Sequence, residues 1–323
     1  METSILRALH TRRDFLRRSG ATAAALGAAA YLPAAFAADS LPAAYPHSSG
    51  DRRASARLPE GACDCHMHIY DERFPWAAGA RLTHAPATVA MYLQIRRRLG
   101  TARNVVVTPS AYGTDNRCTL DALSQLGASA RGVAVVDDGV SDEELARLDR
   151  AGVKGLRFNL ALGSVTTVAM IEPLARRVAH LGWHLQINMS NGDLLANRDM
   201  LSRLPVPVVF DHFARIPLQD GASHPVFDVV TGLMRDRRAS VKLSGAYLAS
   251  RSGAPSYADV APLARALIDA APAQVVWGSD WPHPTEQHKP DDARLLDLMA
   301  AWAGSDERLK AILVDNPARL YHF

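Results

Sequence analysis

The sequence contains few cysteines, which excludes a scaffold built on disulfides. Only three occur among 323 residues, at Cys63, Cys65 and Cys118. Cys63 and Cys65 are two residues apart in an apolar segment, and positions with that spacing on one strand rarely reach disulfide geometry. We therefore expect buried free thiols. A hydrophobic core must hold the fold together, and a chain of this length with 48% apolar residues can supply one.

The sequence also lacks an excess of charge of either sign. Lys and Arg number 36 and Asp and Glu 33, and the first 37 residues hold five of the basic and two of the acidic residues. The rest of the chain is therefore balanced at 31 of each. Nucleic acids and anionic membranes need a basic surface on their partner, so the balance argues against both after processing. We expect a small molecule as partner, and the oligomeric state stays open.

The apolar run near the N-terminus is too short for a membrane span. It covers residues 21–32, follows the pair Arg12-Arg13 and leads into the small-residue stretch that ends at Ala37. This pattern is typical of a twin-arginine signal peptide over residues 1–37, which predicts export to the periplasm. An N-terminal anchor helix is the alternative, although the run is well under the ~20 residues that a span needs.

The remaining chain divides into a linker and one large domain. Residues 38–58 are rich in Pro, Ser and Gly without periodicity, which predicts a flexible linker. Over residues 59–323, eight short apolar segments alternate with amphipathic ones, which predicts an α/β fold, a (β/α)8 TIM barrel. A doubly wound open sheet is the alternative. The eight expected strands are 62–69, 104–109, 132–136, 153–158, 184–188, 206–211, 240–243 and 274–278.

Two of the expected helices have recognisable ends. The helix over 141–151 begins with Ser141 and Glu144, which have the spacing of a capping box. The helix over 168–181 is followed by Gly182, a residue that favours helix termination.

Histidine or aspartate follows three of the expected strands. His66 and His68 end the first strand, and their spacing places both imidazoles on one side of it. Asp211 and His212 end the sixth, and Asp280 follows the eighth. Because the catalytic groups of such barrels gather where strands end, we expect these side chains at one rim.

Structural roles are the alternative for these residues. Asp280 can be a helix N-cap, and His283, which lies between two prolines, is interpreted as a loop residue that shapes the pocket. His180 and His184 are interpreted as structural histidines. The pair after the first strand is interpreted as functional, because two imidazoles on one face add little to packing.

These motifs together resemble the amidohydrolase superfamily, and within it the branch of lactone hydrolases that act on pyrone dicarboxylates and sugar lactones. The resemblance covers about residues 60–323 and implies the same barrel. Besides the strand-end residues, it is carried by segments 109–117 (PSAYGTDNR), 155–159 (GLRFN), 277–283 (WGSDWPH) and 314–321 (VDNPARLY).

The resemblance raises the question of a divalent metal such as zinc, for which His66, His68 and Asp280 are the available ligands. Metal-bound members of the superfamily usually add a Lys or Glu after the fourth strand and a His after the fifth. Here the fourth strand ends with 157–159 (RFN) and the fifth with 186–188 (QIN). A cation and amides at these positions favour the metal-independent branch, so we expect no cofactor, with a metal site as the alternative.

Without a metal, the mechanism must come from side chains. Asp280 is expected to be the general base that activates water. His66, His68 and His212 are expected to donate hydrogen bonds to the lactone carbonyl. The related lactone isomerase has Asn in place of Asp280, so the carboxylate favours hydrolysis over isomerisation.

Arginines and neutral polar residues are the candidates for substrate binding. Arg157 and Arg215 suit a carboxylate clamp, and Ser110, Tyr112 and Asn188 suit neutral hydrogen bonds. Lactonases for pyrone dicarboxylates are understood to carry further arginines after strands four and seven. This chain lacks them, which favours a lactone with one carboxylate, a sugar-acid lactone or a muconolactone.

The sequence therefore predicts an exported lactone hydrolase. The alternatives are a metal-dependent amidohydrolase or decarboxylase, a lactone isomerase, and a non-catalytic periplasmic protein that binds a sugar acid.

Overall fold

Eight parallel strands form the centre of the computed structural model, which describes residues 44–163 and 165–323. Each strand pairs with the next along the chain, from β1 to β8. A parallel bridge between Met67 and Trp281 joins the last strand region to the first. The strands are β1 (Cys63–Met67), β2 (Arg103–Val107), β3 (Ala130–Ala134), β4 (Val153–Asn159), β5 (His184–Asn188), β6 (Val208–Phe210), β7 (Ala239–Leu243) and β8 (Val275–Trp277).

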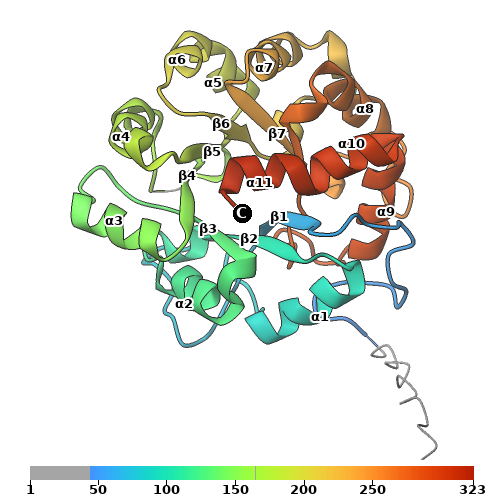
Figure 1. The fold of residues 1–323 in the computed structure, drawn as a ribbon, viewed down its shortest axis with the longest axis horizontal. Helices are drawn as coiled ribbons and strands as arrows, with labels where there is room; N and C mark the ends of the chain where they lie inside the picture. Colours follow the sequence, from blue (N-terminus) through green and yellow to red (C-terminus); the bar gives the residue numbers. More distant parts are fainter. Residues whose placement is uncertain (1–43, 164) are drawn as a thin grey trace, which may run out of the picture. The chain divides into compact units, whose positions relative to one another are not determined.

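Helices surround the strands, and the last helix crosses one end of the barrel (Figure 1). They are α1 (Val89–Leu99), α2 (Arg117–Leu126), α3 (Asp142–Arg150), α4 (Ile171–Val178), α5 (Asn191–Ala196), α6 (Arg198–Arg203), α7 (Pro225–Arg235), α8 (Ala261–Ala270), α9 (Asp292–Ala303), α10 (Asp306–Lys310) and α11 (Asn316–Tyr321). Strands and helices thus alternate as in a (β/α)8 TIM barrel, which confirms the predicted fold and excludes the doubly wound sheet.

The predicted elements all appear, with shifted ends. Each of the eight expected strands overlaps an observed one, and the fifth has the expected bounds. The helix over 141–151 is α3, and its N-cap hydroxyl of Ser141 accepts a hydrogen bond from the backbone of Glu144. The helix expected over 168–181 is broken: α4 is flanked by single 3-10 turns on both sides, before Gly182 ends it in a left-handed conformation.

The core has two layers. The larger one lies between the strands and the helices, and a smaller cluster contains Cys63, Cys65 and Tyr321 of α11. All three cysteines are buried and free, as expected.

Part of the expected linker packs on the barrel. The guanidinium of Arg98 donates to the Ser48 hydroxyl and to the backbone oxygens of Ser49 and Arg52, and the Trp281 indole donates to Pro46. The segment from 44 to 58 is therefore held at several points. The expected signal peptide lies outside the described residues, and no described helix is long and apolar enough to cross a membrane.

Candidate active site

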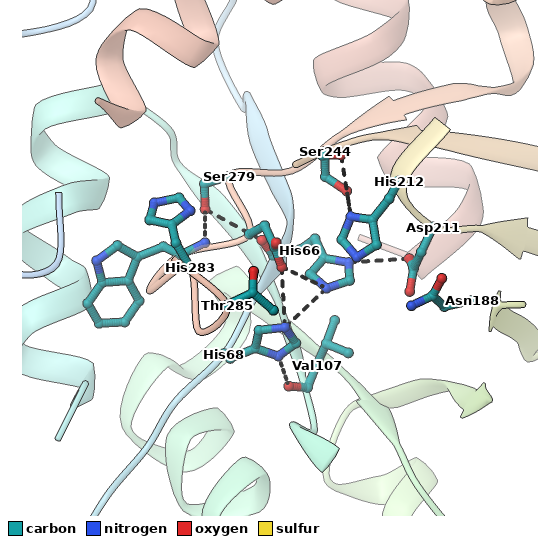
Figure 2. A network of polar contacts seen from close by, with 12 residues as sticks. His66, His68, Val107, Asn188, Asp211, His212, Ser244, Ser279, His283 and Thr285 are labelled. Atoms are coloured by element: carbon teal, nitrogen blue, oxygen red, sulfur yellow. Dashed lines mark hydrogen bonds and ion pairs between the residues drawn. The ribbon is translucent and has the colours of Figure 1, made fainter. Parts of the chain in front are cut away.

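The expected strand-end residues meet at the carboxyl end of the barrel (Figure 2). His66 and His68 come from the end of β1, His212 follows β6, and Asp280 follows β8. The approach of β8 to β1 requires a glycine at position 278, because a Cβ there would lie 2.4 Å from the Cβ of His66. The backbone N–H of Asp280 then donates to the His66 carbonyl oxygen at 2.7 Å.

Three side-chain atoms form a tight cluster at this rim. The Nε2 atoms of His66 and His68 are 3.2 Å apart, and Oδ1 of Asp280 lies 3.4 Å from each. Burial lowers the pKa of both histidines, and Asp280 only partly offsets this. Burial alone would raise the pKa of Asp280, but the surrounding His212, His68 and His66 hold that pKa well below its ordinary value. The cluster therefore pairs two neutral imidazoles with a carboxylate at neutral pH.

A buried lysine lies directly beneath His66. The Lys242 ammonium, fully buried on β7, lies 3.1 Å from Nδ1 of His66 and 3.3 Å from Oδ1 of Asp211, and it donates to the Gln186 side chain at 2.7 Å. Burial lowers the pKa of Lys242 against the opposing charge of Asp211, while Lys242 holds the pKa of Asp211 well below its ordinary value despite burial. We call Lys242, Asp211 and His66 the inner chain.

These contacts fix where the ring protons lie. Nδ1 of His66 lies 3.1 Å from the Lys242 ammonium, which can only donate, and 3.3 Å from Oδ1 of Asp211, which can only accept; taking the shorter contact as the hydrogen bond makes Nδ1 an acceptor and leaves the ring proton on Nε2. His68 has the opposite tautomer, because its Nδ1 donates to the Val107 carbonyl oxygen at 2.8 Å. Its Nε2 is therefore an acceptor, so the neutral ring faces Asp280 without a proton between them.

His212 points at the same cluster from the other side (Figure 2). Its Nδ1 lies 3.0 Å from the Ser244 hydroxyl and 3.3 Å from the Ser244 carbonyl oxygen. When the hydroxyl donates across the shorter contact, the ring proton of His212 lies on Nε2. Of the three histidines, His212 and His68 line the rim cavity, and His66 lies beneath them.

Four of the five expected binding residues line that cavity: Arg157, Ser110, Asn188 and Arg215. Arg157 is buried and donates to the Thr108 carbonyl oxygen, while its Nε has no partner among the described residues. Arg215 is exposed. Tyr112 is not at the cavity wall, because its hydroxyl is engaged with the backbone of Asp71.

A second chain of polar groups lies behind Asp280. Its Oδ2 accepts a 2.6 Å hydrogen bond from the hydroxyl of Tyr247, which follows β7. Nδ1 of His283 lies 3.0 Å from that hydroxyl, and its Nε2 lies 3.1 Å and 3.2 Å from the two carboxylate oxygens of Asp292 at the start of α9. We call Asp292, His283 and Tyr247 the outer chain.

The structure bears differently on the structural roles considered for Asp280, His283 and His184. Asp280 is not a helix N-cap, since Asp291 caps α9 and its carboxylate accepts from the backbone of Arg294. His283 is fully buried in the outer chain and does not line the cavity. His184 is buried at the start of β5, at the opposite end of the barrel.

The cluster at the rim has the spacing of a metal site. Donor atoms 3.2–3.4 Å apart are the edges that a tetrahedral ion with bonds of about 2.1 Å requires, and His66, His68 and Asp280 supply them. Among the described residues, His66, Asp211 and His212 are a second group of possible ligands. The placement of protons does not fit such an ion, because the contact with Lys242 puts a proton on Nε2 of His66, the atom that must be bare to bind a metal.

Sequence reasoning did not find Lys242, Tyr247 or Asp292. Lys242 had a usable signal, since a single lysine inside an apolar strand must point either to solvent or to a buried partner. Tyr247 and Asp292 had none, because only the folded loops bring them next to Asp280 and His283.

The fold and this rim define a barrel enzyme whose polar groups meet above the carboxyl ends of the strands. The amidohydrolase family model (Amidohydro_2) matches residues 63–323. The chain belongs to the amidohydrolase family.

Three relatives place the chain more closely. It is 38% identical to a 2-pyrone-4,6-dicarboxylate hydrolase of Comamonas testosteroni, over 82% of this chain and 91% of that protein. It is 32% identical to a 4-sulfomuconolactone hydrolase of Hydrogenophaga intermedia, over 82% and 89%. The apo crystal structure of ATU3138 from Agrobacterium tumefaciens superposes with a TM-score of 0.78 at 26% identity, covering 86% of this chain and 98% of that one.

Proposed function

We propose that this protein hydrolyses a lactone that carries an acidic group, using Asp280 as the general base and no metal ion. The observation that carries the proposal is the Asp280 carboxylate at the cavity wall. Asp280 and His68 both line the rim cavity, and Oδ1 of Asp280, which lies 3.4 Å from Nε2 of His68, is an acceptor that suits a proton of a bound water molecule.

In the proposed reaction, that water attacks the lactone carbonyl. Its lone pair forms the new C–O bond while one of its protons moves to Oδ1 of Asp280, which the neighbouring histidines keep ionised. Nε2 of His68 accepts from Nε2 of His66 at 3.2 Å, a different role from the donor that the sequence suggested. His66 donates from Nε2 and keeps the cluster together.

The developing oxyanion needs donors on the other side of the cavity. Nε2 of His212 and the guanidinium of Arg157 are available there, and a well-aimed donor contributes about 3 kcal/mol to such a step. The tetrahedral intermediate then collapses, the bond to the ring oxygen breaks, and the proton on Asp280 passes to that oxygen. The product is a hydroxy acid, and Asp280 returns to its ionised form.

The relatives support the substrate class. Two of them are named as hydrolases of a pyrone dicarboxylate and of sulfomuconolactone, both cyclic esters with acidic groups. In this chain Arg157 and Arg215 line the cavity and offer cationic partners for one such group.

The test is a panel of lactones read by proton release, with wild type and Asp280→Asn. We expect wild type to open an acidic lactone and the variant to lose about 1000-fold or more in kcat while folding normally. Hydrolysis of simple esters or amides, but of no lactone, would overturn the proposed class. A non-catalytic binder would bind the ligand equally well as wild type and variant, without turnover in either.

Metal content decides the second part of the proposal. Wild type purified without added metal is assayed before and after chelation, and metal content is measured in the same samples. We expect full activity in chelated protein. Stoichiometric zinc that leaves together with activity would contradict the metal-free route and favour a metal-dependent amidohydrolase.

We also propose that the protein is exported by the twin-arginine route. Fractionation of cells that express the full chain, or a variant with Arg12→Lys and Arg13→Lys, tests this. Wild type is expected in the periplasm and the variant in the cytoplasm.

A further inference from the structure

The two carboxylate oxygens of Asp280 have different surroundings. Oδ1 faces the imidazoles of His66 and His68, while Oδ2 accepts from the Tyr247 hydroxyl. The latter contact, at 2.6 Å, has the length of a charge-assisted hydrogen bond between a hydroxyl and a carboxylate. Tyr247 therefore holds one oxygen and leaves the other free to face the cavity.

The direction of the remaining hydrogen bonds follows from the single proton of Tyr247. Because that proton goes to Asp280, the Tyr247 oxygen is an acceptor toward His283. Nε2 of His283 faces the carboxylate of Asp292. Both ring nitrogens of His283 therefore face acceptors, and each is satisfied only if it carries a proton.

The outer chain is buried and fixed at its far end. His283 and Asp292 are 0% exposed, whereas Tyr247 is partly buried; Asp292 is the first residue of α9, where the helix dipole favours a negative charge. The backbone N–H of His283 donates to the Asp280 carbonyl oxygen at 2.8 Å. This backbone hydrogen bond holds His283 and Asp280 at a fixed distance from each other.

The backbone of this loop is held in an unusual conformation. Asp280 and His283 have φ angles of 63° and 58°, which non-glycine residues rarely adopt. Such strain persists only where surrounding contacts over-determine the geometry. Here those contacts include the outer chain and the hydrogen bond from Asp280 to His66.

We infer that the outer chain is a positioning device for the reaction: Asp292 and His283 orient the Tyr247 hydroxyl, which holds Oδ2 so that Oδ1 of Asp280 faces the substrate. This rests on the proposed function for the role of Asp280. None of the three outer-chain residues lines the rim cavity, so they act through Asp280 and do not touch the substrate.

A double-mutant cycle, with the lactone that the panel identifies as substrate, tests the inference. Tyr247→Phe should lower kcat about 10- to 100-fold and change KM less than about threefold, because binding groups stay in place. His283→Gln should lower kcat in wild type and have no further effect in Tyr247→Phe. If His283→Gln lowered kcat equally in wild type and in Tyr247→Phe, the inference that His283 acts through Tyr247 would be wrong. Tyr321→Phe, which removes a buried hydroxyl at the other end of the barrel, is the matched control and should keep kcat within about twofold.

A spectroscopic measurement separates failure of this inference from failure of the proposed function. The ¹⁵N resonances of the His283 ring should report two protonated nitrogens in wild type, and one in Asp292→Asn. This result needs no substrate. A His283 ring with a single proton in wild type would overturn the hydrogen-bond order, whatever the enzyme hydrolyses. Thermal unfolding of each variant shows whether a loss of kcat comes from loss of the fold.

Discussion

Two buried chains approach Asp280 from different sides and are built differently. The inner chain ends in a lysine beside an aspartate, both fully buried inside the barrel, and reaches Oδ1 through His66. The outer chain ends in Asp292 at a helix start and reaches Oδ2 through Tyr247. In the inner chain, His66 and Lys242 lie on strands and Asp211 directly follows one, while two members of the outer chain, Tyr247 and His283, lie in the segments after β7 and β8.

The difference teaches what each chain can control. Lys242 is on β7 and Asp211 directly follows β6, so they fix the His66 tautomer with little freedom. The outer chain orients a carboxylate whose backbone is itself in a loop. An inner-chain change should therefore lower the free energy of unfolding more than an outer-chain change does.

The largest effect is expected from Lys242→Met. The variant leaves the Asp211 carboxylate buried without its cation, and breaking a buried pair in this way costs about 3–5 kcal/mol of the free energy of unfolding. The variant also removes the donor to Nδ1 that keeps the His66 proton on Nε2, so kcat should fall at least about tenfold. Chemical denaturation and steady-state kinetics measure the two effects.

Adding Asp211→Asn to Lys242→Met separates them. The double variant no longer buries an unpaired charge, so most of the free energy of unfolding should return. The amide of the new side chain, at the position 3.3 Å from Nδ1 of His66, is a weaker donor than an ammonium, so activity should recover less than stability. If Lys242→Met alone is as stable as wild type, the two residues do not form a buried ion pair.

A smaller effect is expected from Asp292→Asn in the outer chain. Asparagine keeps one acceptor for His283 but removes the negative charge. We therefore expect the free energy of unfolding to fall by about 1–3 kcal/mol and kcat to decrease several-fold. Comparison of its denaturation curve with that of Lys242→Met gives the ranking directly. A greater loss of stability in Asp292→Asn would reverse the comparison between the chains.

The sequence predicts the residues at the rim but not the buried partners that contact them. The barrel and its rim residues were predictable because alternation and strand-end position are local properties of the chain, visible at His66, His68 and Asp280. The partners that set their protonation were not. Lys242 lies 176 positions from His66 in sequence, and only closure of the barrel brings the two together. The position of Tyr112 outside the cavity lining was not predictable for the same reason, since its hydroxyl partner Asp71 lies on another loop.

The smallest effect concerns the pH dependence of stability. Burial and the charge of Lys242 lower the pKa of His66 and that of His184, the latter to about 3, while Asp211 opposes the shift in both. These histidines are neutral in the folded protein and bind protons on unfolding below their ordinary value of 6.5. Their contribution to stability is present above that value and is lost as the pH falls.

Asp64 has the opposite sign. Burial raises its pKa to about 6 although Ser279 and Tyr92 donate to it, so its contribution is present below 3.8 and is lost as the pH rises through 6. The pH dependence of the free energy of unfolding of wild type contains contributions from the histidines and from Asp64. The contribution of one group is therefore measured as the difference between wild type and a variant that lacks it.

His184→Gln supplies that difference without touching either chain directly. The free energy of unfolding is measured by denaturant titration at several values between about pH 6.5 and pH 4.5. The wild-type value should fall more steeply with acid than that of the variant, by up to about 1.4 kcal/mol per pH unit for one histidine. The charged groups that act on His184 are Lys242, Asp211 and His322, and all three remain in the variant. If the free energy of unfolding of wild type and of the variant had the same pH dependence, His184 would be protonated in the folded barrel.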